Sequence, residues 1–198
     1  MYTFLLSLLL PALAVASPLS LSKSNHQRDD NGAGCTSNSQ HGFAWQITGF
    51  DYHASYIFTT PAHQNSWGYV NFNITNPAVP GVAATCSGTS NQLSDFFYGT
   101  MPYTCTTPDD SSLPRKTTFD FSRPSGLLRI NETWSCADQD PQYPTTFTGY
   151  GAVNVKLNCT DVTHINSNWT IGQIYSNRLV NCAPVDLALK PYAMTAIA

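Results

Sequence analysis

The chain has 198 residues, of which 42% are hydrophobic and 11% charged, and its formal net charge is −3. The nine Lys and Arg residues are scattered, so no basic stripe is present that would bind nucleic acid or an anionic membrane surface. Glu occurs once, whereas Tyr, Phe, Pro and Gly are abundant. Because exposed helices depend on Glu, Lys, Gln and Ala, this composition predicts an all-β protein.

The N-terminal segment has the features of a targeting sequence. Residues 4–15 are almost wholly apolar, and the run ends in the small-x-small sequence Ala-Val-Ala, which is typical of a signal-peptidase cleavage site. The run is shorter than the roughly 20 residues that a membrane-spanning helix needs, and Pro11 interrupts it. We therefore expect a signal peptide at residues 1–16, secretion of the protein to the extracellular space, and a flexible leader or pro-segment at residues 17–40.

Alternating apolar and polar residues predict a series of short strands separated by turn-forming sequences rich in Pro, Gly, Asn and Asp. No helical period and no internal repeat is evident. We expect one domain at residues 41–190, followed by a C-terminal tail at 191–198, and a compact antiparallel β-barrel or sandwich as its architecture. In chain order, the alternating runs are 43–48, 70–75, 119–121, 128–134, 153–159 and 185–190.

The six cysteines predict three disulfides. An even number of cysteines in a secreted chain is typical of a disulfide framework, and the sequence alone leaves every connectivity open. No close Cys–Cys or His–Cys spacing indicates a metal site, and no motif indicates a cofactor. Segment length favours Cys86 with Cys105 and Cys159 with Cys182, since each pair closes a compact segment; Cys35 with Cys136 follows by elimination.

Four Asn-x-Thr sequons predict N-glycosylation, at Asn73, Asn131, Asn158 and Asn168. A glycan needs a side chain that faces solvent. In the alternating runs, the first three of these residues lie on the polar face, which was assigned from the apolar residues alone. The positions of these three sequons thus agree with the polar faces of the predicted strands, and we expect at least two of the sequons to be occupied.

Several stretches, taken in order and spacing, resemble the Alternaria major-allergen family of small secreted fungal proteins, from about residue 35 to residue 190. The stretches are Cys35 ten residues before Trp45-x-Ile47-x-x-Phe50; Asn65-Ser66-Trp67-Gly68 leading into Phe72-x-Ile74-x-Asn76; Cys86 and Cys105 around a Tyr-rich loop; Phe119-Asp120-Phe121 before Ser125-Gly126-Leu127-Leu128; and the pair Cys159 and Cys182.

The resemblance implies a compact antiparallel β-barrel without catalytic machinery. It also implies a role as an allergen-like effector or elicitor that binds plant defence or other apoplastic proteins, or a small phenolic or glycan ligand. In the family an N-terminal cysteine can join two chains; here Cys136 offers Cys35 an intrachain partner, so both a monomer and a homodimer stay open. Longer loops around residues 40–64 and 165–178 also depart from the family pattern.

Two carboxylate arrangements are the best candidates for catalysis. Glu132 interrupts the apolar face of its strand and, if buried, could act as an acid, with Asp120 as its partner in a carbohydrate-active enzyme; an ion pair with Arg129 or Arg123 is the structural alternative. Asp51 and His53 would share one face of a strand, but we expect an exposed pair without a nucleophile. The sequence therefore favours a non-catalytic protein, with an enzyme or a glycan-binding module as alternatives.

Aromatic residues offer a possible binding surface in the first half of the chain. Three consecutive aromatics, Phe96, Phe97 and Tyr98, cannot all face one side of a strand, and we expect this cluster, together with Trp67, to be exposed. Exposed rings could hold a sugar or a phenolic ring, although aromatics more often pack in the core.

Overall fold

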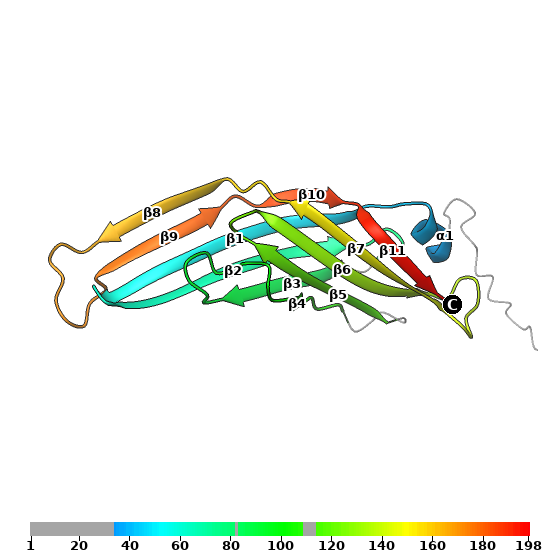
Figure 1. Ribbon diagram of the computed structural model, residues 1–198, viewed down its shortest axis with the longest axis horizontal. Helices are drawn as coiled ribbons and strands as arrows, with labels where there is room; N and C mark the ends of the chain where they lie inside the picture. Colours follow the sequence, from blue (N-terminus) through cyan, green and yellow to red (C-terminus); the bar gives the residue numbers. More distant parts are fainter. Residues whose placement is uncertain (1–33, 82, 109–113) are drawn as a thin grey trace, which may run out of the picture. The chain divides into compact units, whose positions relative to one another are not determined.

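The computed structural model describes residues 34–81, 83–108 and 114–198. The predicted signal peptide and most of the predicted leader lie outside the described residues. Within these residues the chain forms one short helix and eleven strands, which confirms the all-β prediction (Figure 1). No helix among them is both long enough and apolar enough to cross a membrane.

Two antiparallel sheets make up the domain. The helix is α1 (Cys35–Gln40), and the strands are β1 (Trp45–Thr60), β2 (His63–Thr75), β3 (Ala83–Ser90), β4 (Tyr103–Thr104), β5 (Arg115–Ser122), β6 (Leu127–Cys136), β7 (Thr145–Asn154), β8 (Cys159–Ile165), β9 (Ser176–Cys182), β10 (Val185–Leu189) and β11 (Pro191–Ile197). The first sheet has the order β3-β2-β1-β9-β8, with β10 also paired to β1, and the second has the order β11-β7-β6-β5-β4.

The core lies between the two sheets. Alternate residues of the facing strands are buried there, and the rings of Phe50 and Phe121, 5.3 Å apart between centroids, join one sheet to the other, as do those of Phe72 and Phe119 at 4.9 Å. Gly151 lies against the Trp45 indole, and a side chain at that position would collide with it. The described strands form a sandwich and not the closed barrel that the family resemblance implied.

The three disulfides are Cys35–Cys136, Cys86–Cys105 and Cys159–Cys182, the same pairs that segment length and elimination favoured. The first of them fastens α1 to the end of β6, and β11 pairs with β7 along its whole length. The domain is therefore wider than the predicted residues 41–190, because the end of the predicted leader and the predicted tail are both parts of it. The predicted long loop at 40–64 is also wrong, since β1 occupies most of it.

Candidate functional site

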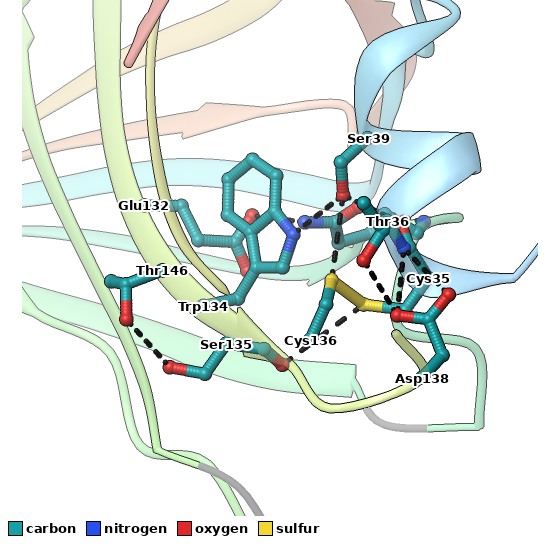
Figure 2. Close-up of a disulfide and its surroundings, with 11 residues drawn as sticks. Cys35, Thr36, Ser39, Glu132, Trp134, Ser135, Cys136, Asp138 and Thr146 are labelled. Carbon is teal, nitrogen blue, oxygen red and sulfur yellow. Dashed lines mark hydrogen bonds between the residues drawn. A yellow bond between two sulfur atoms is a disulfide. The ribbon is translucent and has the colours of Figure 1, made fainter. Parts of the chain in front are cut away.

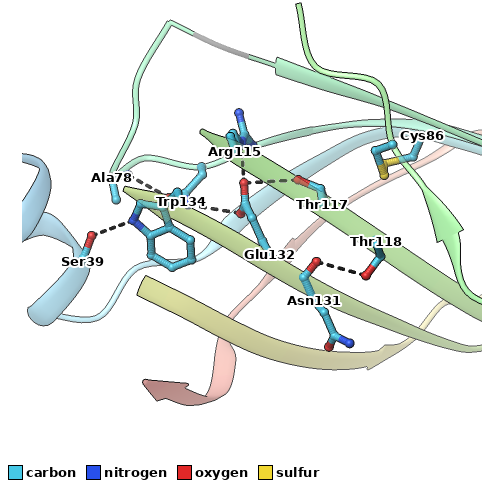
Figure 3. Close-up of polar contacts among 11 residues, drawn as sticks. Ser39, Ala78, Cys86, Arg115, Thr117, Thr118, Asn131, Glu132 and Trp134 are labelled. Carbon is cyan, nitrogen blue, oxygen red and sulfur yellow. Dashed lines mark hydrogen bonds and ion pairs between the residues drawn. A yellow bond between two sulfur atoms is a disulfide. The ribbon is translucent and has the colours of Figure 1, made fainter. Parts of the chain in front are cut away.

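Glu132, the first catalytic candidate, lies in a sealed polar cluster inside the sandwich. Its side chain has no exposed surface, and the Arg115 guanidinium forms an ion pair with one carboxylate oxygen (Figure 3). The other oxygen accepts a hydrogen bond of 3.1 Å from the Asn76 amide. The Thr117 hydroxyl donates to the carboxylate at 3.4 Å. Each carboxylate oxygen therefore has a donor within the protein.

Strand register brings these residues together. Thr117 of β5 lies directly opposite Glu132 of β6. Arg115 lies two residues before Thr117 on the same face of β5, and from this diagonal position its long side chain can reach Glu132. Asn76, just after β2, is held by the backbone amide of Ala78, which donates to the Asn76 side-chain oxygen at 2.9 Å. Burial raises the pKa of the Glu132 carboxyl, and the Arg115 charge and the Asn76 amide offset only part of that rise.

This geometry rules out the predicted pairing of Glu132 with Asp120. Asp120 lies on the opposite face of β5, where Arg129 donates to it at 2.8 Å in a partly exposed ion pair. A glycosidase needs two carboxylates that flank a substrate-filled cleft, whereas the Glu132 side chain has no exposed surface. The expected ion-pair partners of Glu132 were also wrong, because Arg115 takes that place and the Arg123 guanidinium lies over the Tyr52 ring.

The disulfide Cys35–Cys136 closes the same end of the sandwich (Figure 2). It holds α1 against β6, so that the Ser39 hydroxyl accepts a hydrogen bond of 3.0 Å from the buried Trp134 indole. The Thr36 hydroxyl donates to Asp138 at 2.6 Å on the outside. These contacts make the helix a cover for this end of the core.

The second catalytic candidate is a surface pair. His53 Nδ1 lies 2.9 Å from an Asp51 carboxylate oxygen, and both side chains are partly exposed on the outer face of the first sheet. The imidazole is stacked on the Tyr69 ring at 4.9 Å between centroids. Stacking and the hydrogen bond together hold the imidazole in place on the strand surface, which is consistent with a structural pair.

Two of the four residues of the predicted aromatic surface are buried. Phe96 and Phe97 are both inside the core, which corrects the prediction that the three-aromatic cluster is exposed. Phe96 has a positive φ of 66°, so the chain here leaves the alternation of a strand and both rings can turn inward. Tyr98 and Trp67 are exposed, as expected.

All four sequon asparagines face solvent. Asn73 and Asn131 lie on the polar faces assigned from the sequence. The predicted strand at 153–159 is wrong, because Asn158 lies in the connection between β7 and β8, and Asn168 lies in the loop between β8 and β9. At Asn73 the side-chain oxygen accepts a hydrogen bond of 3.0 Å from the Thr85 hydroxyl, which leaves the amide nitrogen, the atom that carries a glycan, free to face outward. Occupancy of these sites stays a prediction.

The strands β8 and β9 with their connecting loop, residues 159–182, form an exposed hairpin that we call the β8–β9 arm. Every residue of β8 after Cys159 is exposed, and Ile171 in the loop has 92% of its surface exposed. Val162 and Leu179 are opposite one another on the two strands and are also exposed. The sequence predicts a long loop at residues 165–178 that departs from the family pattern, and it does not predict these exposed aliphatic residues.

Comparison with known proteins gives one match. A sequence model of the family described as Alternaria alternata allergen 1 matches residues 47–182, more than half of the chain, and confirms the resemblance found from the motifs. No curated protein and no solved structure matches. The matched segment contains most of β1 and all of β2 to β9, and therefore the β8–β9 arm and the Glu132 cluster, while α1, β10 and β11 lie outside it.

Proposed function

The chain belongs to the Alternaria alternata allergen 1 family, and we propose that it is a secreted, non-catalytic protein that binds an extracellular plant defence protein through the β8–β9 arm. The observation that carries the proposal is the exposed apolar surface of this arm. Side chains of Val162, Ile165, Ile171 and Ile174 all have more than half of their surface exposed. Several exposed aliphatic side chains on one hairpin of a folded protein favour a role in protein–protein contact.

The charge of the arm supports a protein partner and not a nucleic acid or a membrane. Arg178 and Asp161, on adjacent strands, form a bidentate ion pair with each other. Their charges cancel, and the remaining rim consists mainly of Asn, Thr and Ser. Exposed apolar side chains among uncharged polar residues are a common composition of protein interfaces.

Secretion and the absence of catalysis each rest on a separate feature. Three disulfides with no free cysteine among the described residues suit an oxidising extracellular compartment. The best carboxylate candidate for catalysis, Glu132, has no exposed surface and is held by Arg115 and Asn76. A function through the surface is therefore better supported than a reaction at an internal site.

Affinity capture from plant apoplastic fluid tests the proposal. The secreted wild-type protein, the double variant Val162→Ser/Ile171→Ser and the matched control Ile197→Ser are immobilised in parallel, because Ile197 is equally exposed but lies on β11. We expect a plant protein that is retained by the wild type and the control and lost from the double variant. Equal capture by all three proteins, or capture of no protein by the wild type, would contradict the proposal.

A further inference from the structure

A small surface pocket lies beside the exposed indole of Trp67, away from the Glu132 cluster. Its volume is about 130 Å³. One wall is the start of β2, and the other is the loop that follows β3. The lining residues are Gln64, Asn65, Ser66, Trp67, Asn91 and Leu93.

The lining is polar but uncharged. Three carboxamides, from Gln64, Asn65 and Asn91, offer both donors and acceptors, and the Ser66 hydroxyl can do either. No Lys, Arg, Asp or Glu belongs to the lining, so an anionic ligand such as a phosphate or a uronate would find no partner charge there. This set of groups suits a ligand that carries several hydroxyls and no charge.

The Trp67 indole adds an apolar plane to this polar set. The residue has 44% of its surface exposed, and the neighbouring Leu93 is also exposed. An aromatic ring can pack against the C–H face of a sugar ring while amides bind the hydroxyls at its edge, since a large, flat ring offers apolar contact area at low entropic cost. A pocket of this volume is smaller than the sites that hold drug-sized ligands and fits a single ring.

The second wall of the pocket is fixed before any ligand arrives. The Tyr56 hydroxyl donates to the Ser94 carbonyl at 2.7 Å, and the Phe96 amide donates to the Gln92 carbonyl at 2.7 Å. The Phe96 ring lies directly on Gly68 of β2, where any side chain would collide with it. The buried aromatic therefore anchors the loop that carries Asn91 and Leu93.

The first wall is equally constrained. Trp67 and its neighbours lie in the part of β2 that pairs with β1, where Ser55 faces Trp67. Ser66 is buried, and the Gln64 amide donates to its hydroxyl at 2.7 Å, which orients both groups. A site whose two walls are held in place loses less conformational entropy on binding than a mobile one.

From this arrangement we propose that the Trp67 pocket binds one neutral pyranose unit of a glycan. The site is separate from the β8–β9 arm and goes beyond the proposed protein binding. A linear neutral polysaccharide would place one ring against the indole, with its neighbouring rings extending over the exposed outer face of the first sheet, where Asn71 and Asn181 lie near the His53–Tyr69 stack.

Titration of the secreted protein with defined oligosaccharides tests this proposal. The neutral probes are cellohexaose, laminarihexaose and mannohexaose, with hexagalacturonate as the charged comparator, and binding is followed by calorimetry and tryptophan fluorescence. We expect at least one neutral probe to bind the wild type at millimolar concentration or below and more tightly than hexagalacturonate. Trp67→Ala should lower the affinity by about ten-fold or more, which corresponds to about 1.4 kcal/mol.

Trp169→Ala serves as the matched control, because Trp169 is a partly exposed tryptophan that packs on Tyr175 in the β8–β9 arm. It should bind like the wild type, and Asn91→Ala should weaken binding without changing the circular dichroism spectrum. Three results would overturn the proposal: no neutral probe binds, hexagalacturonate binds more tightly, or the two tryptophan variants lose affinity equally. The arm variant Val162→Ser/Ile171→Ser should keep its sugar binding, which separates this test from the capture experiment.

Discussion

Two regions of the domain are held together in different ways. One is the end of the sandwich that carries α1, and the other is the β8–β9 arm. Around α1, Trp45, Trp134 and Glu132 are fully buried, the Trp134 indole donates a hydrogen bond to Ser39, and Glu132 forms an ion pair with Arg115. In the arm, no residue of β8 is buried, and this edge strand is held by its backbone ladder with β9 and by a disulfide at the base, while β9 in turn pairs with β1. Burial thus stabilises one region, while the apolar side chains of β8 lie at the surface in the other.

The disulfides repeat this contrast. Cys35–Cys136 joins residues that are 101 positions apart and fastens a cover onto the core, whereas Cys159–Cys182 closes a loop of only 23 positions between paired strands. A longer closed loop removes more entropy from the unfolded chain. The two bonds should therefore contribute differently to global stability and to the local order of the arm.

Removal of the Cys35–Cys136 disulfide should have the largest effect. The double variant Cys35→Ser/Cys136→Ser is expected to lose about 4.7 kcal/mol of unfolding free energy, the value that the chain-entropy model gives for a loop of roughly 100 residues. Urea denaturation followed by fluorescence measures this loss. If this variant loses no more unfolding free energy than Cys159→Ser/Cys182→Ser, the proposed difference between the two regions is wrong.

Replacement of Arg115 by Met should come next. It leaves the buried Glu132 carboxylate without its opposite charge, and the expected loss is about 3–5 kcal/mol. Asp120→Asn is the matched control, because it removes one member of a partly exposed ion pair on the same two strands and should cost about 0–1 kcal/mol. Comparable losses of unfolding free energy in the two variants would contradict the prediction that Glu132 needs the Arg115 charge inside the protein.

The variant Cys159→Ser/Cys182→Ser should lose about 3 kcal/mol, as expected for a short closed loop. Its distinctive effect should be local. Hydrogen exchange at the backbone amides of β8 and β9 should accelerate, since these strands have few buried side chains to hold them. The amides of β6 and β7 should keep most of their protection; an equal acceleration in both sheets would mean that the arm is not an independent unit of stability.

Much of the fold could be predicted because alternation is a local property of the chain. Val70, Phe72 and Ile74 alternate with exposed residues in β2 as expected, and the solvent-facing Asn73 follows from the same pattern. The partner of Glu132 could not be predicted in this way. Its identity depends on the register between β5 and β6, which places Arg115 on the diagonal and sends Arg129 to the opposite face.

The aromatic cluster and the arm were missed for related reasons. Burial of both Phe96 and Phe97 depends on a positive φ at a residue other than glycine, which no sequence pattern indicates. The arm has weak alternation because both faces of β8 are exposed, so Val162 and Ile165 point to opposite sides and neither faces a core. Periodicity detects strands that have one buried face, and a strand without one resembles a loop.

The smallest effect on stability is expected in the arm itself. Ile171→Ala should change the unfolding free energy by no more than about 0.5 kcal/mol, because Ile171 makes almost no contact that unfolding would remove. The same substitution at the fully buried Ile130 should cost about 2–5 kcal/mol through lost burial and the cavity that it leaves. Urea denaturation of the two variants side by side measures the difference. A loss above 1 kcal/mol at Ile171 would indicate that the loop packs against the domain in solution. If the substitution is neutral, a loss of capture in the arm variant reflects a lost contact with the partner and not a partly unfolded protein.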